Sequence, residues 1–146
     1  MIRKATTEDV NDIAYLSTLL WTDNTTSEMR SEYEKMLTDE ECAIFISIEN
    51  DRCVGFAQCQ LRHDYVEGTE SSPVGYLEGI FVSEGYRGKG IARELLLCCE
   101  KWAEEKGCSE FASDCELTNE DSLRFHIKMG FSEANRIICF TKRLRG

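Results

Sequence analysis

The sequence predicts an α/β fold in one domain, and three observations support this. Strand-like and helix-like patterns alternate through the second half of the chain, which calls for at least one crossover connection. The 146 residues correspond to the commonest size of a single domain. Hydrophobic residues make up 42% of the chain, enough for a buried core and too many for a disordered protein. We therefore expect one domain over residues 1–146.

The first third of the chain predicts a strand followed by two helices. Residues 2–5 form a short strand pattern. Thr6 or Thr7 can cap the following helix, in which apolar residues recur at helical spacing from 10 to 20. A second helix is expected from 27 to 37.

Strand signals follow these helices. Residues 42–49 and 53–61 are rich in β-forming residues and are separated by an Asn-Asp turn, which predicts a hairpin. Residues 63–74 are polar and predict a long loop. Residues 75–82 form a largely apolar strand interrupted by Gly79, and glycine within a strand often marks a bulge or a close backbone approach.

Two helices and two strands are expected in the rest of the chain. The helices are predicted over 91–106 and 119–129, with Gly107 and Gly130 placed to end them. The strands are predicted over 110–115 and 137–144.

Charge and hydropathy exclude several classes of function. The chain has 17 basic and 27 acidic residues and a net charge of −10, so nucleic acid is not expected as a partner. Such a surface attracts a small cationic substrate, although acidity can also serve only solubility. No apolar run approaches the roughly 20 residues of a membrane helix. The N-terminus lacks a signal-peptide pattern, so we expect a cytoplasmic protein with no membrane partner.

The chain has eight cysteines, and their spacing does not indicate a disulfide scaffold. Six lie in strand-like runs, and Cys98 and Cys99 are adjacent on a helical pattern. No Cys-x-x-Cys pair occurs, so no metal site is predicted. We interpret these residues as buried, reduced thiols that pack as small hydrophobic side chains, with a catalytic thiol as the alternative.

A glycine-rich basic loop, Arg87-Gly88-Lys89-Gly90-Ile91-Ala92, joins an expected strand to an expected helix. Amide groups at the start of a helix lack intrahelical partners, and the helix dipole adds positive character. Small residues at 88, 90 and 92 let a phosphate approach the backbone, and two basic side chains add charge. The loop therefore predicts a pyrophosphate site. It is neither a P-loop nor a Rossmann fingerprint, and the alternative is an ordinary strand-to-helix turn.

The loop resembles the Arg/Gln-x-x-Gly-x-Gly/Ala signature of the GCN5-related N-acetyltransferases (GNAT), with Arg87, Gly90 and Ala92 in its fixed positions. The strand over 76–82 and the helix from Asn119 that ends in Gly-Phe also resemble that family. The resemblance implies a mixed, splayed central sheet with helices on both faces. It also implies acetyl-CoA as the cosubstrate and no metal.

The same resemblance implies roles for individual residues. The loop amides bind the CoA pyrophosphate, a strand pairs with the pantetheine arm, and a backbone N–H near the bulge polarises the thioester carbonyl. The expected cofactor-binding residues are Ile80, Phe81, Val82, Arg87, Gly88, Lys89, Gly90, Ile91, Ala92 and Asn119.

Further segments resemble a narrower group, the aminoglycoside 6′-N-acetyltransferases. These are residues 62–66, 71–74, 77–82 and 112–114, together with Trp21 after the first helix. This resemblance implies acetylation of the 6′-amino group of aminoglycoside antibiotics, and thereby antibiotic resistance. The alternatives are acetylation of another amine, such as a polyamine or a protein N-terminus, a non-catalytic acyl-CoA-binding module, and a purely structural α/β domain.

Two carboxylates, Glu78 and Asp114, are expected on the two strands that flank the acyl site. A carboxylate in a buried strand is costly without a partner, and carboxylates hold ammonium groups, so we favour a functional role. Either can accept the proton that the substrate amine loses before it attacks the thioester directly. Trp21 and Tyr65 are expected either to line the substrate pocket or to pack in the core.

His126 stands where many members of the family have a tyrosine that protonates the leaving thiolate. It is a candidate acid, because imidazole titrates near neutral pH, and a structural histidine is the alternative. In relatives with this layout the terminal strands often join a dimer. We therefore expect the strand over 137–144 to join a homodimer, since an unpaired edge strand favours such pairing.

Overall fold

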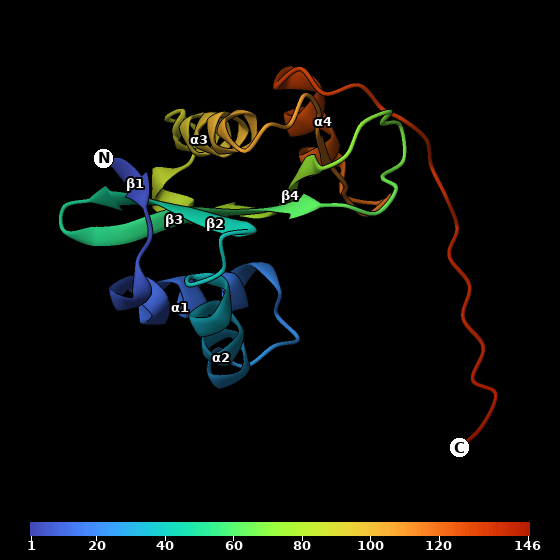
Figure 1. The fold of residues 1–146 in the computed structure, drawn as a ribbon. Coiled ribbons are helices and arrows are strands. Elements are labelled where there is room, and N and C mark those ends of the chain that lie inside the picture. The colour runs from blue at the N-terminus through green and yellow to red at the C-terminus, as the bar shows by residue number, and fades with distance from the viewer. The chain divides into compact units, whose positions relative to one another are not determined.

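A mixed five-stranded sheet, in the order β1-β2-β3-β4-β5, is the centre of residues 1–114 in the computed structural model, which describes residues 1–146 (Figure 1). The strands are β1 (Ile2–Lys4), β2 (Cys42–Glu49), β3 (Arg52–Arg62), β4 (Val74–Val82) and β5 (Phe111–Ser113). The first four strands are antiparallel to their neighbours, and β5 runs parallel to β4. The mixed sheet and its one crossover confirm the predicted fold class.

Helices cover both faces of this sheet (Figure 1). They are α1 (Val10–Leu20), α2 (Thr26–Met36) and α3 (Ile91–Glu105), and the short 3₁₀ helices η1 (Thr7–Asp9) and η2 (Glu84–Tyr86) precede α1 and α3. Helices α1 and α2 share one core with the sheet, in which Ile13, Tyr33 and Phe56 are fully buried. Helix α3 lies on the other face and buries Leu95 and Cys99.

Local sequence signals account for most of these boundaries. The Thr25 hydroxyl caps α2 by accepting a hydrogen bond from the Glu28 amide at 3.2 Å. Asn50 and Asp51 both have positive φ, as a two-residue primed hairpin turn requires, so Glu49 pairs directly with Arg52. The predicted strands and helices of this unit are therefore confirmed to within a few residues, except that β5 is shorter than expected.

Strands β4 and β5 pair over only three residues, and this makes the sheet splayed. The paired positions run from Gly75 with Phe111 to Leu77 with Ser113. Residues 79–82 continue β4 after the irregularity at Glu78 and pair with β3 on one side only. This segment, which we call the open edge of β4, presents backbone groups without a neighbouring strand of this chain.

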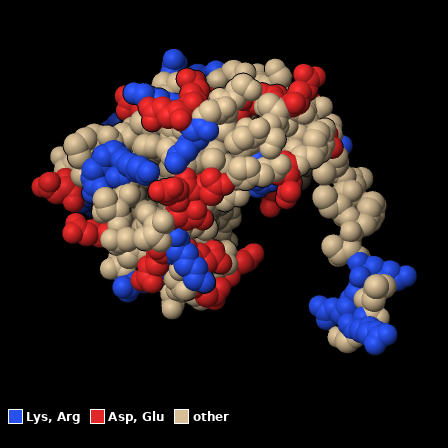
Figure 2. All heavy atoms as spheres, viewed as in Figure 1, with Lys and Arg blue, Asp and Glu red and all other residues tan.

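Residues 115–146 form a second compact unit, which is described by itself. It contains α4 (Glu120–Lys128), whose cap is Asn119. The predicted strand over 137–144 is wrong, since residues 131–146 form neither helix nor strand. Strand propensity alone does not make a strand, and this segment has no strand partner in the chain. The side chains of Ile137, Ile138, Phe140 and Leu144 are 66–87% exposed, and Figure 2 shows basic side chains gathered at the end of the segment.

The cysteines follow the prediction in part. None of the eight forms a disulfide, and Cys59, Cys99 and Cys108 are buried. Cys115 and Cys139 are exposed, contrary to prediction, because β5 ends before the first and no strand forms around the second. None of the helices combines the length and apolar character that crossing a membrane requires.

Candidate active site

The glycine-rich loop joins β4 to α3 and leaves the start of that helix open. Gly88 and Gly90 have φ values of +77° and +84°, a region that strongly favours glycine. A Cβ atom at either position would meet nothing within 4 Å, so the space beside the backbone is open. Gly90 is the N-cap of α3 and supplies no side-chain cap for the first amides. Ile91 is buried and Ala92 is half-buried. The open space beside the glycines and the uncapped amides of the helix fit a pyrophosphate.

The two basic residues of the loop are themselves held in place. Arg87 donates a 2.7 Å hydrogen bond from Nε to the Val82 carbonyl, and its guanidinium lies 5.3 Å from the centre of the Phe81 ring. The Lys89 ammonium lies 5.4 Å from the centre of the Tyr86 ring. Arg87 thus links the loop to the end of β4 by a hydrogen bond, and its positive charge stays beside the predicted pyrophosphate site.

The open edge of β4 ends beside this loop. Its residues Phe81 and Val82 are buried and Ile80 is half-buried. Because the side towards β5 has no strand partner after Leu77, an extended ligand can add there as a strand. This is the geometry that the resemblance implied for the pantetheine arm.

A β-bulge re-aims Glu78 at the point where the open edge starts. Gln58 pairs with Gly79 and the next residue, Cys59, pairs with Leu77, so Glu78 is the extra residue on β4. Arg62 binds its carboxylate from Nε and Nη2 at 2.9–3.1 Å. Burial raises the pKa of Glu78, the hydrogen bonds from Arg62 oppose that rise, and the charge of Asp114 adds to it.

Asp114 directly follows β5 and lies near Glu78, because the last residue of β5 pairs with the residue before the bulge. Its Oδ2 accepts a 2.5 Å hydrogen bond from the hydroxyl of Tyr76, and Asp114 itself is exposed. Burial and this acidic partner raise the pKa of Tyr76. The structure therefore brings the two predicted carboxylates together at the splay of the sheet.

Trp21 and Tyr65 take different positions. The Trp21 ring lies against the backbone of Gly79 and meets the Phe56 ring edge-on, with 6.4 Å between ring centres. It is half-buried, packs against the core cluster and lies beside the bulge. Tyr65 is 76% exposed in the loop before β4, which contradicts core packing for this residue.

Asn119 and His126 lie in the second unit. The Asn119 side chain accepts a hydrogen bond from the Ser122 amide at 3.1 Å and so caps α4. His126 Nδ1 lies 2.7 Å from the Ser122 carbonyl oxygen, which can only accept, so Nδ1 carries a proton. The aromatic ring of Phe131 packs edge-on against the imidazole.

Sequence analysis did not single out the two residues that contact the carboxylates. They are Arg62, which binds Glu78, and Tyr76, which binds Asp114. Arg62 lies at the end of β3, and its guanidinium sits 3.5 Å from the centre of the Tyr76 ring. Register predicts this contact once the β3–β4 pairing is known, because Arg62 pairs with Val74, two residues from Tyr76. An arginine at the end of a buried strand was the available signal.

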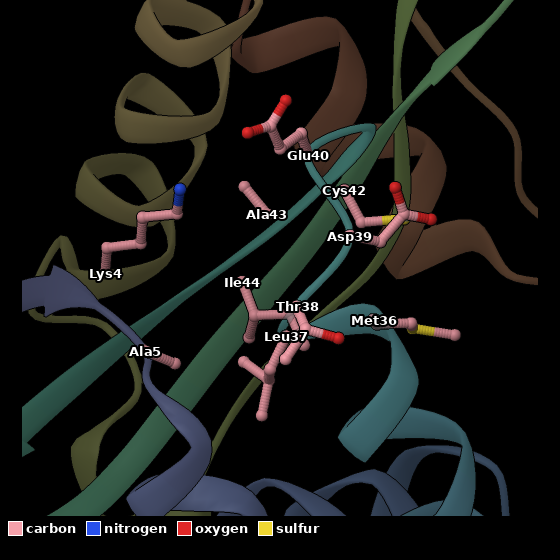
Figure 3. A pocket seen from close by; sticks show the side chains of 10 residues that line it. All are labelled: Lys4, Ala5, Met36, Leu37, Thr38, Asp39, Glu40, Cys42, Ala43 and Ile44. Atoms are coloured by element: carbon pink, nitrogen blue, oxygen red, sulfur yellow. The ribbon is translucent and has the colours of Figure 1, made fainter.

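A small pocket elsewhere contains none of these residues (Figure 3). It lies where the end of α2 meets β1 and β2, and its lining is Lys4, Ala5, Met36, Leu37, Thr38, Asp39, Glu40, Cys42, Ala43 and Ile44. Asp39 there accepts a 2.9 Å hydrogen bond from the Glu41 amide and stabilises the turn into β2.

A splayed sheet with an open strand edge, a glycine loop and paired carboxylates defines the class of acyl-CoA-dependent acyltransferases. The chain belongs to the acetyltransferase (GNAT) family, whose sequence model matches residues 10–131. It is similar to the aminoglycoside N(6′)-acetyltransferase type 1 of Stenotrophomonas maltophilia, with 41% identity over 95% of this chain and 90% of the relative. For the protein of the same name from Serratia marcescens, the identity is 40% over 88% and 89%.

Solved structures agree with these relatives. Aminoglycoside N-acetyltransferase AAC(6′)-Iy in complex with CoA matches with a TM-score of 0.94 and 36% identity, over 98% of this chain and 94% of that one. The same enzyme in complex with the bisubstrate analogue CoA-S-monomethyl-acetylneamine matches with a TM-score of 0.93, over 98% and 97%. AAC(6′)-Ih from Acinetobacter baumannii matches with a TM-score of 0.92 and 33% identity, over 99% of both chains.

Proposed function

We propose that the protein transfers the acetyl group of acetyl-CoA to the 6′-amino group of aminoglycosides, and so confers resistance to them. The relatives bear this activity in their names, and one solved relative holds an analogue that joins CoA to an acetylated aminoglycoside fragment. The observation that carries the proposal is the position of Glu78 and Asp114. Both lie where the open edge of β4 begins, and they form an acidic site for an ammonium group beside the expected thioester.

The cofactor roles divide between the loop and the strand. The amides around Gly88 and Gly90 hold the pyrophosphate, with Arg87 and Lys89 supplying positive charge. Backbone groups of Ile80 to Val82 pair with the pantetheine arm along the open edge. This places the thioester beside the bulge.

The chemistry is one direct transfer without a covalent enzyme intermediate. The substrate ammonium loses a proton to Glu78 or Asp114, directly or through water. The amine nitrogen then forms a bond to the thioester carbon while the carbon–sulfur bond breaks, and the electron pair leaves with the CoA sulfur. The nitrogen, which carries a positive charge after the attack, releases its second proton to water and becomes the neutral amide nitrogen. A backbone N–H near Ile80 and Phe81 stabilises the negative charge on the carbonyl oxygen.

His126 is proposed as the acid that protonates the departing thiolate. Its Nδ1 proton is committed to the Ser122 carbonyl, so the transferable proton must be on Nε2. In the neutral ring that nitrogen has no proton. The role therefore requires the imidazolium form, so replacing His126 by Gln should slow turnover most at low pH and least at high pH, where an imidazole no longer carries the second proton.

The decisive experiment follows thiol release from acetyl-CoA with matched acceptors. Neomycin and paromomycin differ in carrying an amino or a hydroxyl group at the 6′ position, so we expect turnover with neomycin and none at that position of paromomycin. Asp114→Ala should reduce kcat/KM for neomycin about a hundredfold or more. Turnover with spermidine or peptides alone would refute the substrate assignment, and CoA binding without any turnover would indicate a non-catalytic module.

We further propose that the protein is a cytoplasmic homodimer formed from single-domain chains. The family match over residues 10–131 crosses the boundary between the two units, which supports one domain. The exposed apolar side chains of Ile138 and Phe140 support pairing of residues 137–144 with a second copy of the chain. Light scattering should give twice the chain mass. Substituting both residues with Asp should give the monomer, and a monomeric wild type would refute the dimer.

A further inference from the structure

Asp114 is an exposed carboxylate whose position depends on a buried neighbour. Tyr76 donates the 2.5 Å hydrogen bond to Asp114 Oδ2 from the strand next to it. An exposed Asp side chain on its own samples several rotamers. A charge-assisted hydrogen bond from a fixed donor selects one of them.

The Tyr76 ring is fixed on both sides. The residue is 6% exposed and packs with Val66 and Val74 in a small core cluster. The guanidinium of Arg62 covers the ring at 3.5 Å from its centre. The hydroxyl therefore has a defined position, as a group that orients a functional side chain needs.

Arg62 joins this pair to the second carboxylate. The guanidinium that covers Tyr76 also binds both oxygens of Glu78. The order of contacts is Glu78, Arg62, Tyr76, Asp114, so the two acidic groups belong to one continuous network. A change at Tyr76 acts on Asp114 through a single hydrogen bond and leaves the ion pair of Glu78 intact.

We propose that Tyr76 is a positioning residue for the transfer reaction: its hydroxyl holds Asp114 in the geometry in which that carboxylate meets the substrate amine. The inference rests on the proposed function of Asp114. It adds a residue that does not itself touch the reacting atoms.

Tyr76→Phe is the appropriate perturbation, because it removes the hydroxyl and keeps the ring beneath Arg62. We expect kcat/KM for the amine to fall roughly tenfold or more, the size of one hydrogen bond to a charged group. The KM for acetyl-CoA should stay unchanged. Tyr33→Phe is the matched control: Tyr33 is fully buried and its hydroxyl lies 3.4 Å from the Gln58 side chain, apart from the acidic network. It should leave kcat/KM within about twofold.

A double-mutant cycle separates positioning from general damage to the fold. If Tyr76 acts through Asp114, adding Tyr76→Phe to Asp114→Asn should change kcat/KM by less than about twofold. A tenfold loss that is equally large in both backgrounds would overturn the proposal. So would a wild-type kcat/KM in Tyr76→Phe while Asp114→Asn is impaired.

The inference and the proposed function fail in different ways. If the wild-type chain acetylates another amine, the same cycle is run with that amine and the role of Tyr76 is still decided. If no amine is acetylated, the proposed function fails, and urea unfolding of the same four variants tests the contact. The free energies of unfolding should show a coupling between Tyr76→Phe and Asp114→Asn. Additive losses would refute the contact.

Discussion

Gly79 is the residue whose substitution tests the site geometry most directly. A Cβ atom there would lie 2.6 Å from Trp21 Cζ2 and closer still to Cη2 of the same ring. Real Cβ contacts are longer, so the rigid indole must move when Gly79 becomes Ala. Overpacking of this kind costs about 1–3 kcal/mol. For a chain of this size, each kcal/mol lowers Tm by roughly 3 °C.

Urea unfolding of Gly79→Ala measures that cost, and thiol release measures its effect on the amine. Gly85→Ala is the matched control, because a Cβ at Gly85 meets nothing within 4 Å and φ there is ordinary. Gly79→Ala should also raise the KM for the amine, since the displaced Trp21 ring lies beside the bulge that carries Glu78. In a Trp21→Ala background the same substitution should cost much less. Equal destabilisation in both backgrounds would refute the contact between Trp21 and the bulge.

Three further predictions concern the loop, the ion pair and acid stability. Gly90→Ala should weaken acetyl-CoA binding in calorimetry, because φ of +84° costs a side chain about 1–2 kcal/mol, while Gly85→Ala should not. Arg62→Ala should move the acidic limb of the pH–rate profile to higher pH, because Arg62 holds down the pKa of Glu78, and Arg62→Lys should move it less. The Arg3 hydrogen bond lowers the pKa of Asp9, so its stabilisation is present above the unfolded pKa and is lost as pH falls through the folded value. Asp9→Asn, which removes the charge that Arg3 binds, should cost about 1–3 kcal/mol at pH 7 and flatten acid unfolding, whereas exposed Asp12→Asn should not.

Much of the fold was predictable because its signals are local. The turn at Asn50 and Asp51, the cap at Thr25 and the helix start after Gly90 each depend on a few neighbouring residues. The segment over 137–144 has the same local strand signal without forming a strand. Its outcome depends on a pairing partner, which is a non-local property that composition does not contain.

The sequence predicted individual residues of the candidate site but not the contacts between them. Glu78 and Asp114 were singled out because a carboxylate in a buried strand is costly unless it has a partner or a function. Arg62 and Tyr76 were missed because an arginine at the end of a strand and a tyrosine within one are both common, so neither stands out as strongly as a carboxylate in a strand. Only the register of β3 against β4 places the guanidinium over the ring. The two strands are separated by an 11-residue loop, and their register depends on the bulge in β4. The sequence indicated that bulge only through Gly79.

The bulge links the acceptor site to the cofactor site through one irregularity. Glu78 is the extra residue of the bulge and therefore lies outside the ladder with β3. The pairing of β4 with β5 stops one residue before Glu78. The open edge that follows leads directly to the glycine loop. A regular β4 paired along its full length to β5 would bury the strand edge and hold Glu78 in the ladder. The same local break therefore exposes the backbone for an extended ligand and aims a carboxylate beside it. This accounts for the acidic network starting at the bulge rather than along the surface of the sheet.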